Sequence, residues 1–105
     1  MQTIKLTPYE NSLIGQYLPG DLVVVLLDTT DAGFTVTLPD ASGTEKTLFN
    51  FVTIGINNAT IAPINGQFIN NETLIPLAQH ECMGVTSLLN KYHIVSKYSK
   101  ALIFF

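Results

Sequence analysis

Three side chains that can do chemistry are adjacent at His80, Glu81 and Cys82, and His93 follows later in the chain. A cysteine beside a histidine can form a nucleophile pair, and thiolate and imidazole are ligands that zinc prefers. In an extended segment, however, His80 and Cys82 project from one face and Glu81 from the other. The sequence has neither a CxxC nor an HExxH spacing, and nothing in it signals an oxyanion hole. We therefore expect no enzymatic activity, no metal site and no cofactor. One histidine repeated about a threefold axis is the metal arrangement left open.

The four aspartates Asp21, Asp28, Asp31 and Asp40 each stand beside Gly, Thr or Pro, where a strand is expected to end. Paired carboxylates could bind Ca²⁺ or support hydrolysis, but no DxDxDG loop is present. Asx-turns, in which the carboxylate accepts backbone hydrogen bonds, explain the placement better. The seven glycines form neither GxGxxG nor GxxxxGK(S/T), so nucleotide binding is not expected.

Charge is scarce in this chain of 105 residues: charged residues make up 12% and hydrophobic residues 47%, with a formal charge of −3. Soluble domains carry about 25% charged residues, so much of this surface is expected to contact protein rather than water. The chain has five lysines and no arginine. Because nucleic-acid contacts depend on clustered cations, nucleic acid is not an expected partner, although Lys91, Lys97 and Lys100 could form a basic face.

Cys82 is the only cysteine, so an intrachain disulfide is excluded. Residues 1–12 contain no apolar run of secretory-signal length, and no stretch reaches the roughly 20 apolar residues of a membrane helix. We expect a chain that is made in a cytoplasm, has no membrane partner, and stays soluble or joins an assembly.

The elements that must position these side chains are predicted to be strands. Residues 33–38 alternate between apolar and threonine positions, which is the period of a half-buried strand. Residues 22–27 (LVVVLL) are apolar at every position, so this strand needs cover on both faces. A domain of this size has difficulty covering both faces itself, which makes a neighbouring subunit the expected cover.

Turn signals recur along the rest of the chain and separate further short strands. These strands are expected at residues 47–54, 59–62, 67–69, 73–77, 85–89 and 92–96. Asn65-Gly66 predicts a type I′ hairpin turn, and Asn90-Lys91 predicts the turn of a final hairpin. Residues 88–98 also fit a helical spacing, but their β-branched and aromatic content favours a strand. The expected fold class is all-β, a small antiparallel β-sandwich or barrel without a βαβ crossover.

The chain is divided into an extended N-terminal arm over residues 1–20, a β-domain over 21–98 and a C-terminal strand or tail over 99–105. The tail ends in ALIFF, an aggregation hazard unless it pairs or inserts into a neighbour. The arm could add an edge strand to a partner. The residues expected at the interface between subunits are Leu22, Val23, Val24, Val25, Leu26, Leu102, Ile103, Phe104, Phe105, Ile4, Leu6 and Tyr9.

The order and spacing of several short motifs resemble a β-module of tailed-bacteriophage fibres and capsid decorations. The motifs are DTTDAGFTVTLP at 28–39, FVTIGINNATIAP at 51–63, Gly66, Ile69, Leu77, VTSLL at 85–89 and YHIVS at 92–96. Together they span about residues 21–98. The chain departs from the family pattern at Thr53, where Asn often stands, and lacks the Trp that often precedes the final Tyr-x-Ile. It also starts with Met1 and adds the ALIFF tail.

The resemblance implies an all-β homotrimer without catalytic residues. A freestanding copy with an arm and an apolar tail is expected to be a structural protein of the virion. It would be a capsid decoration, head-fibre or cement protein whose trimers bind the major capsid protein or another virion protein and stabilise neighbouring capsomers. The alternative is a receptor-binding fibre tip or tail-fibre module that contacts a host surface glycan. Exposed aromatic residues in the loops would favour this alternative, whereas a copy number close to that of the capsid protein would favour decoration.

Overall fold

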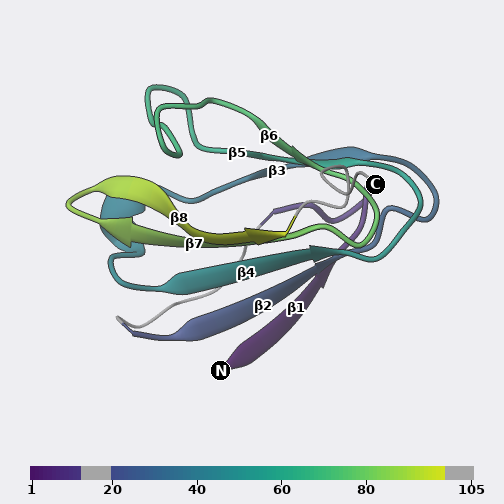
Figure 1. Ribbon diagram of the computed structural model, residues 1–105, viewed down its shortest axis with the longest axis horizontal. Coiled ribbons are helices and arrows are strands. Elements are labelled where there is room, and N and C mark those ends of the chain that lie inside the picture. The colour runs from purple at the N-terminus through teal and green to yellow at the C-terminus, as the bar shows by residue number, and fades with distance from the viewer. Residues whose placement is uncertain (13–19, 99–105) are drawn as a thin grey trace, which may run out of the picture.

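Two β-sheets face each other in the computed structural model, which describes residues 1–12 and 20–98 (Figure 1). The larger sheet, in the order β1-β2-β4-β7-β8, consists of β1 (Gln2–Leu6), β2 (Leu22–Leu27), β4 (Leu48–Thr53), β7 (Cys82–Leu88) and β8 (Lys91–Tyr98). The smaller sheet, in the order β3-β5-β6, consists of β3 (Phe34–Thr37), β5 (Ala59–Ala62) and β6 (Ile75–Leu77). A short 3-10 turn, η1 (Ala41–Gly43), precedes β4. No helix in this part of the chain is long and apolar enough to cross a membrane.

The core lies between the two sheets and is built by the period-2 alternation of the strands. In β2 this alternation turns Val23, Val25 and Leu27 inward, and each is fully buried. Phe49 and Phe51 of β4 stack beside them, with ring centroids 6.2 Å apart. The smaller sheet contributes the facing apolar layer: Val36, Ile61, Ile75 and Leu77. The prediction of an all-β fold is therefore confirmed.

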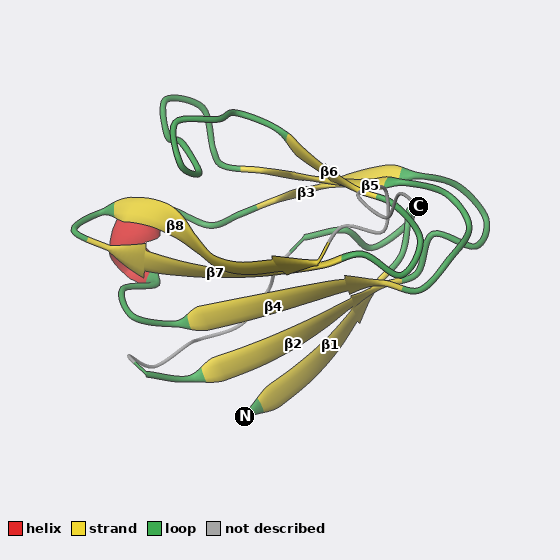
Figure 2. Cartoon of the chain, in the orientation of Figure 1, coloured by secondary structure: helices red, strands yellow, loops and turns green. Residues whose placement is uncertain are grey.

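The strand directions differ from the antiparallel arrangement that the sequence predicts. The pairs β1–β2, β2–β4 and β3–β5 are parallel, whereas β4–β7, β5–β6 and β7–β8 are antiparallel. Parallel neighbours need a long connection that returns the chain to its starting end. For β2–β4 and β3–β5 a strand of the opposite sheet supplies that connection, because the chain runs from β2 through β3 to β4 and then to β5 (Figure 2). Both the parallel and the antiparallel pairs belong to mixed sheets, and the purely antiparallel prediction is wrong.

The two segments that cross between the sheets, residues 28–33 and 54–58, lie against each other. The Thr29 hydroxyl donates to the Asn57 carbonyl at 2.6 Å, and the Asn57 amide donates to the Thr29 carbonyl at 2.7 Å. Gly55 lies so close to this contact that a Cβ there would overlap the backbone of Thr29 and Thr30. This reciprocal pair joins the first crossing to the second just before β3 and β5, where Phe34 pairs with Ala59.

The segment predicted to be an extended N-terminal arm begins instead as part of the β-domain. β1 pairs in parallel with β2 of the same chain, and Leu6 is buried in the core. An apolar residue at every second position favours pairing within the chain, because Ile4 and Leu6 then join the inner face of the sheet. The later part of the expected arm, residues 13–19, and the tail at 99–105 lie outside the described residues.

Two turn predictions require correction. At Asn65-Gly66 only Gly66 has a positive φ, of 90°, and the Ile64 carbonyl accepts from the Gln67 amide at 3.0 Å. This is the pattern of a type II turn, not type I′. The final hairpin is confirmed as β7–β8, but its turn is centred on Leu89 and Asn90, with φ of 54° and 61°. The predicted strand at 67–69 is reduced to isolated bridges made by Ile69 with Glu72 and Tyr92.

Candidate functional site

The reactive side chains singled out in the sequence do not converge on one point. Exposed His80 occupies the turn before β7 with a φ of 66°. Buried Glu81 closes that turn by accepting from the Ala78 amide at 2.8 Å. On the paired strands Cys82 lies opposite Tyr98. His93 lies opposite Thr86, four residues further along β7, which corresponds to roughly 13 Å.

In the described ranges, 1–12 and 20–98, no three His, Cys, Asp or Glu side chains are grouped so that they could hold a metal ion. The expectation that His80, Cys82 and His93 have no catalytic or metal-binding role stays a prediction.

Two of the four aspartates act as the expected Asx caps. Asp28 accepts from the backbone amide and the hydroxyl of Thr30, and these hydrogen bonds, with smaller help from Lys5, lower the pKa of its carboxyl group. Asp40 accepts from the Ser42 amide at 2.9 Å and from Gln67 at 3.1 Å, which lowers its pKa in the same way. These carboxylates stabilise turns rather than forming a reactive pair.

The outer face of the larger sheet carries an apolar patch at its centre. Leu22, Val24 and Leu26 of β2 point away from the core and are only half-buried. Their partners in register on β4 include Leu48 and Val52, which are also half-buried. Among the described elements no third layer covers this side of the sheet. We call the set Leu22, Val24, Leu26, Leu48 and Val52 the outer patch.

The outer patch narrows the interface that the sequence predicts. Val23, Val25 and Leu6 are buried in the core of their own chain, so they offer almost no surface to a neighbour. Ile4 packs against the same core, whereas Tyr9 is 79% exposed. The difference between the inward and outward residues of β2 follows from strand geometry, because only every second side chain of a strand faces outward. The predicted interface residues Leu102, Ile103, Phe104 and Phe105 lie outside the described residues.

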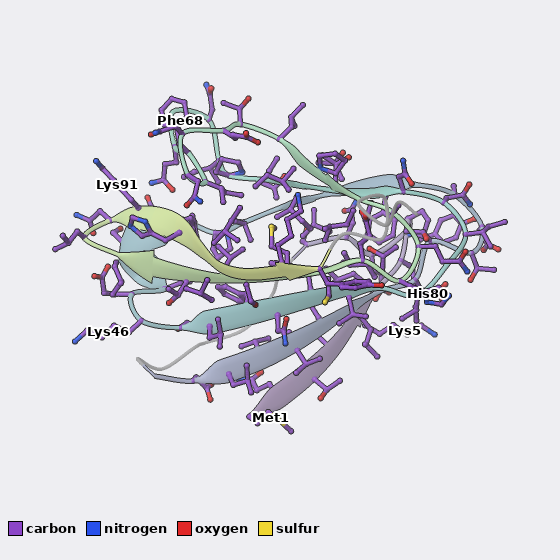
Figure 3. The ribbon with its side chains drawn as sticks, viewed as in Figure 1. Met1, Lys5, Lys46, Phe68, His80 and Lys91 are labelled. Atoms are coloured by element: carbon purple, nitrogen blue, oxygen red, sulfur yellow. The ribbon has the colours of Figure 1, made fainter. Side chains whose placement is uncertain are left out.

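A groove of about 840 Å³ opens at the end of the molecule where the loop after β5 faces the β7–β8 hairpin. Phe68 on that loop and Lys91 at the start of β8 lie at this same end (Figure 3). Phe68 is 51% exposed although its neighbour Ile69 is fully buried. The other residues that line the groove include Gln67, Asn70, Asn71, Asn90, Tyr92 and His93.

The loop that forms one wall of the groove is held by hydrogen bonds of Gln67 and Asn70. Gln67 accepts from the Ala41 amide at 3.1 Å and donates to Asp40, which ties the loop to η1. Asn70 donates its backbone amide to the Tyr92 carbonyl and accepts from the Ile94 amide through its side chain. The loop is therefore fastened to the neighbouring elements on both sides of Phe68.

Tyr92 of β8 also lines the groove, although its side chain is buried. Its hydroxyl donates to the Pro39 carbonyl at 2.7 Å and lies 2.9 Å from the Thr44 hydroxyl. Burial raises the pKa of this phenol to about 12.

The groove could not be predicted from the sequence, because its parts come from segments about twenty residues apart that only the fold brings together. One signal was present: residues 65–71 (NGQFINN) place a single aromatic residue among amides in a segment otherwise typical of a turn.

Comparison with protein-family models gave no match, and neither the curated proteins nor the solved structures gave one. The resemblance to phage β-modules therefore rests on the motifs quoted for it.

Proposed function

We propose that the chain is a self-associating structural subunit of a bacteriophage particle, a capsid decoration or cement protein that acts as a homotrimer. The observation that carries this proposal is the outer patch. A sheet face with five large aliphatic side chains at its centre is typical of a surface that another protein covers. The low charge of the chain and the resemblance to decoration modules support the same function.

The size of the sheet indicates how much of an interface it can supply. Five strands spaced about 4.8 Å apart, each about six residues long, present a plane of roughly 480 Å². A standard interface buries about 800 Å² on each partner. The outer face therefore supplies a large part of one interface, and the apolar residues predicted in the tail would have to supply more.

The functional proposal is tested by counting copies of this chain in purified particles of the phage that encodes it. Quantitative mass spectrometry against the major capsid protein should give a ratio approaching one if the chain decorates the capsid. A few copies per particle would contradict decoration.

One observation favours the alternative function, a fibre tip that contacts a host glycan. This function calls for an exposed aromatic residue in a loop, and Phe68 meets that condition at the edge of a groove. A low copy number, with the chain located at a fibre tip by electron microscopy, would support it.

A further inference from the structure

We propose that the groove between the 67–71 loop and the β7–β8 hairpin binds an oligosaccharide. In this site a pyranose ring stacks on Phe68, and its hydroxyl groups bond to the amides of Asn71 and Asn90 and to Lys91. The inference deepens the alternative function above and does not depend on capsid decoration.

The shape of the groove suits a short chain of sugar units. Its volume of about 840 Å³ lies within the roughly 300–1,000 Å³ of ligand sites. It is open to solvent along the gap between the loop and the hairpin, so a ligand longer than one ring can extend beyond it.

Phe68 provides the apolar part of the recognition. Its ring is half exposed, whereas the adjacent Ile69 fills the core, so the core does not explain why an aromatic side chain stands here. The hydrogen bonds of Gln67 and Asn70 hold the loop on either side of it, which limits the entropy lost when a ligand stacks on the ring. A pyranose has an apolar C–H face that matches such a ring, with hydroxyls around the rim.

The polar groups of the groove suit those hydroxyls. A side-chain amide both donates and accepts hydrogen bonds, as a sugar hydroxyl does. Asn71 and Asn90 stand exposed with φ of 71° and 61°. Asn70 and Gln67, in contrast, use their side chains to hold the loop, so they are positioning residues.

Two other ligand classes fit the groove less well. A peptide that added a strand to β8 would need free backbone N–H and C=O groups on β8 beside the groove. The Tyr92 carbonyl and the Ile94 amide there are already bonded to Asn70. A polyphosphate or nucleic acid would need several cations, but the described residues of the groove offer only Lys91 and the imidazole of His93, in a chain with no arginine and a charge of −3.

The test uses the full-length protein on a printed array of bacterial-surface and mammalian oligosaccharides, followed by NMR titration with the oligosaccharide that binds best. We expect shifts of the side-chain amide signals of Asn71 and Asn90, and a loss of affinity of at least tenfold in Phe68→Ala. Leu74→Ala is the matched control, because Leu74 is 58% exposed and lies outside the groove. It should bind like the parent.

Asn71→Gly and Asn90→Gly are the second pair of variants, because glycine removes each amide and keeps the positive φ. Each should weaken binding while the backbone spectrum stays native. Failure to bind any oligosaccharide at millimolar concentration would overturn the proposal, and so would binding that Phe68→Ala leaves intact. If the oligosaccharide binds but the protein does not adhere to cells displaying it, the site stands and the fibre-tip function fails.

Discussion

At the scale of single residues, buried Tyr92 of β8 bonds through one hydroxyl group to Pro39 and Thr44, which lie on either side of η1. The phenol donates to the Pro39 carbonyl, so the Thr44 hydroxyl serves as the donor in the second hydrogen bond. Tyr92→Phe removes a donor and an acceptor from a site where Thr44 is buried. We expect it to lower the free energy of unfolding by about 1–3 kcal/mol, as measured by urea denaturation at pH 7. An unchanged urea midpoint would show that water replaces both bonds.

The raised pKa of Tyr92 also predicts a loss of stability in alkali. Its folded value of about 12 is above the unfolded value of about 10, so the folded state holds this proton more tightly. The stabilisation is fully present below pH 10 and is lost as the pH rises towards 12. The urea midpoint of the parent should therefore fall more steeply over this range than that of Tyr92→Phe. Equal slopes would show that other groups cause the alkaline loss.

Leu89 is held in a backbone conformation that does not suit its side chain. Its φ is 54° at the first centre of the β7–β8 turn, and it is 87% exposed. Because left-handed conformations cost a side chain with a Cβ about 1–2 kcal/mol, Leu89→Gly should stabilise the protein by about 1 kcal/mol. Thermal unfolding checks this, with Leu88→Gly as the control. Leu88 is a strand residue, so glycine there should destabilise. A lower melting temperature for Leu89→Gly would contradict the argument.

At the scale of elements, the two crossings between the sheets lie against each other and connect the strands that make the parallel pairs β2–β4 and β3–β5. Gly55 permits the close approach of residues 54–58 to 28–33. Gly55→Ala should cost more than about 2 kcal/mol, because the methyl group would overlap backbone that cannot move without breaking the Thr29–Asn57 pair. Gly43→Ala is the matched control, since a Cβ there meets nothing within 4 Å. Chemical denaturation should give a lower free energy of unfolding for Gly55→Ala than for Gly43→Ala. Equal values would contradict the close approach of residues 54–58 to 28–33.

The outer patch gives the second prediction for an element. Val24 lies at its centre, between Thr3 of β1 and Asn50 of β4 in register. Val24→Asp should break self-association, because an unpaired charge in a desolvated interface costs several kcal/mol. Thr35→Asp introduces the same negative charge at an exposed position of β3, in the other sheet, and should leave association intact.

Sedimentation velocity measures the association of both variants, and circular dichroism verifies that they fold. If Val24→Asp does not fold, the near-isosteric Val24→Thr should weaken association to a smaller degree. Association of a folded Val24→Asp equal to that of the parent would exclude the outer patch as the interface.

The strands themselves were predictable because alternation is local. Residues 22–27 and 33–38 lie in strands close to their expected ends, and the burial of β3 follows the alternation expected for it. The direction of pairing was not predictable, since it depends on which sheet the chain enters next. The turn at Asn65-Gly66 was not predictable for a similar reason. The dipeptide fits two turn types, and the hydrogen bonds that Gln67 makes with Asp40 and Ala41 are tertiary contacts that the local sequence does not reveal.

At the scale of the whole molecule, the sequence indicated a covered surface but not its location. The six apolar residues of β2 suggested cover on both faces, and the structure assigns one face to the core and the other to the outer patch. The groove was not predictable because Phe68 and Asn90, which are distant in the sequence, line the same groove only in the folded chain. The outer patch is thus aliphatic, whereas the groove is rich in side-chain amides.

The proposed assembly requires that further copies of the chain cover the outer patch. Size-exclusion chromatography with light scattering on the full-length protein, at micromolar concentration, tests this most directly. We expect a single species with about three times the chain mass of 11.5 kDa. A folded species of 11.5 kDa across the same concentration range would contradict it.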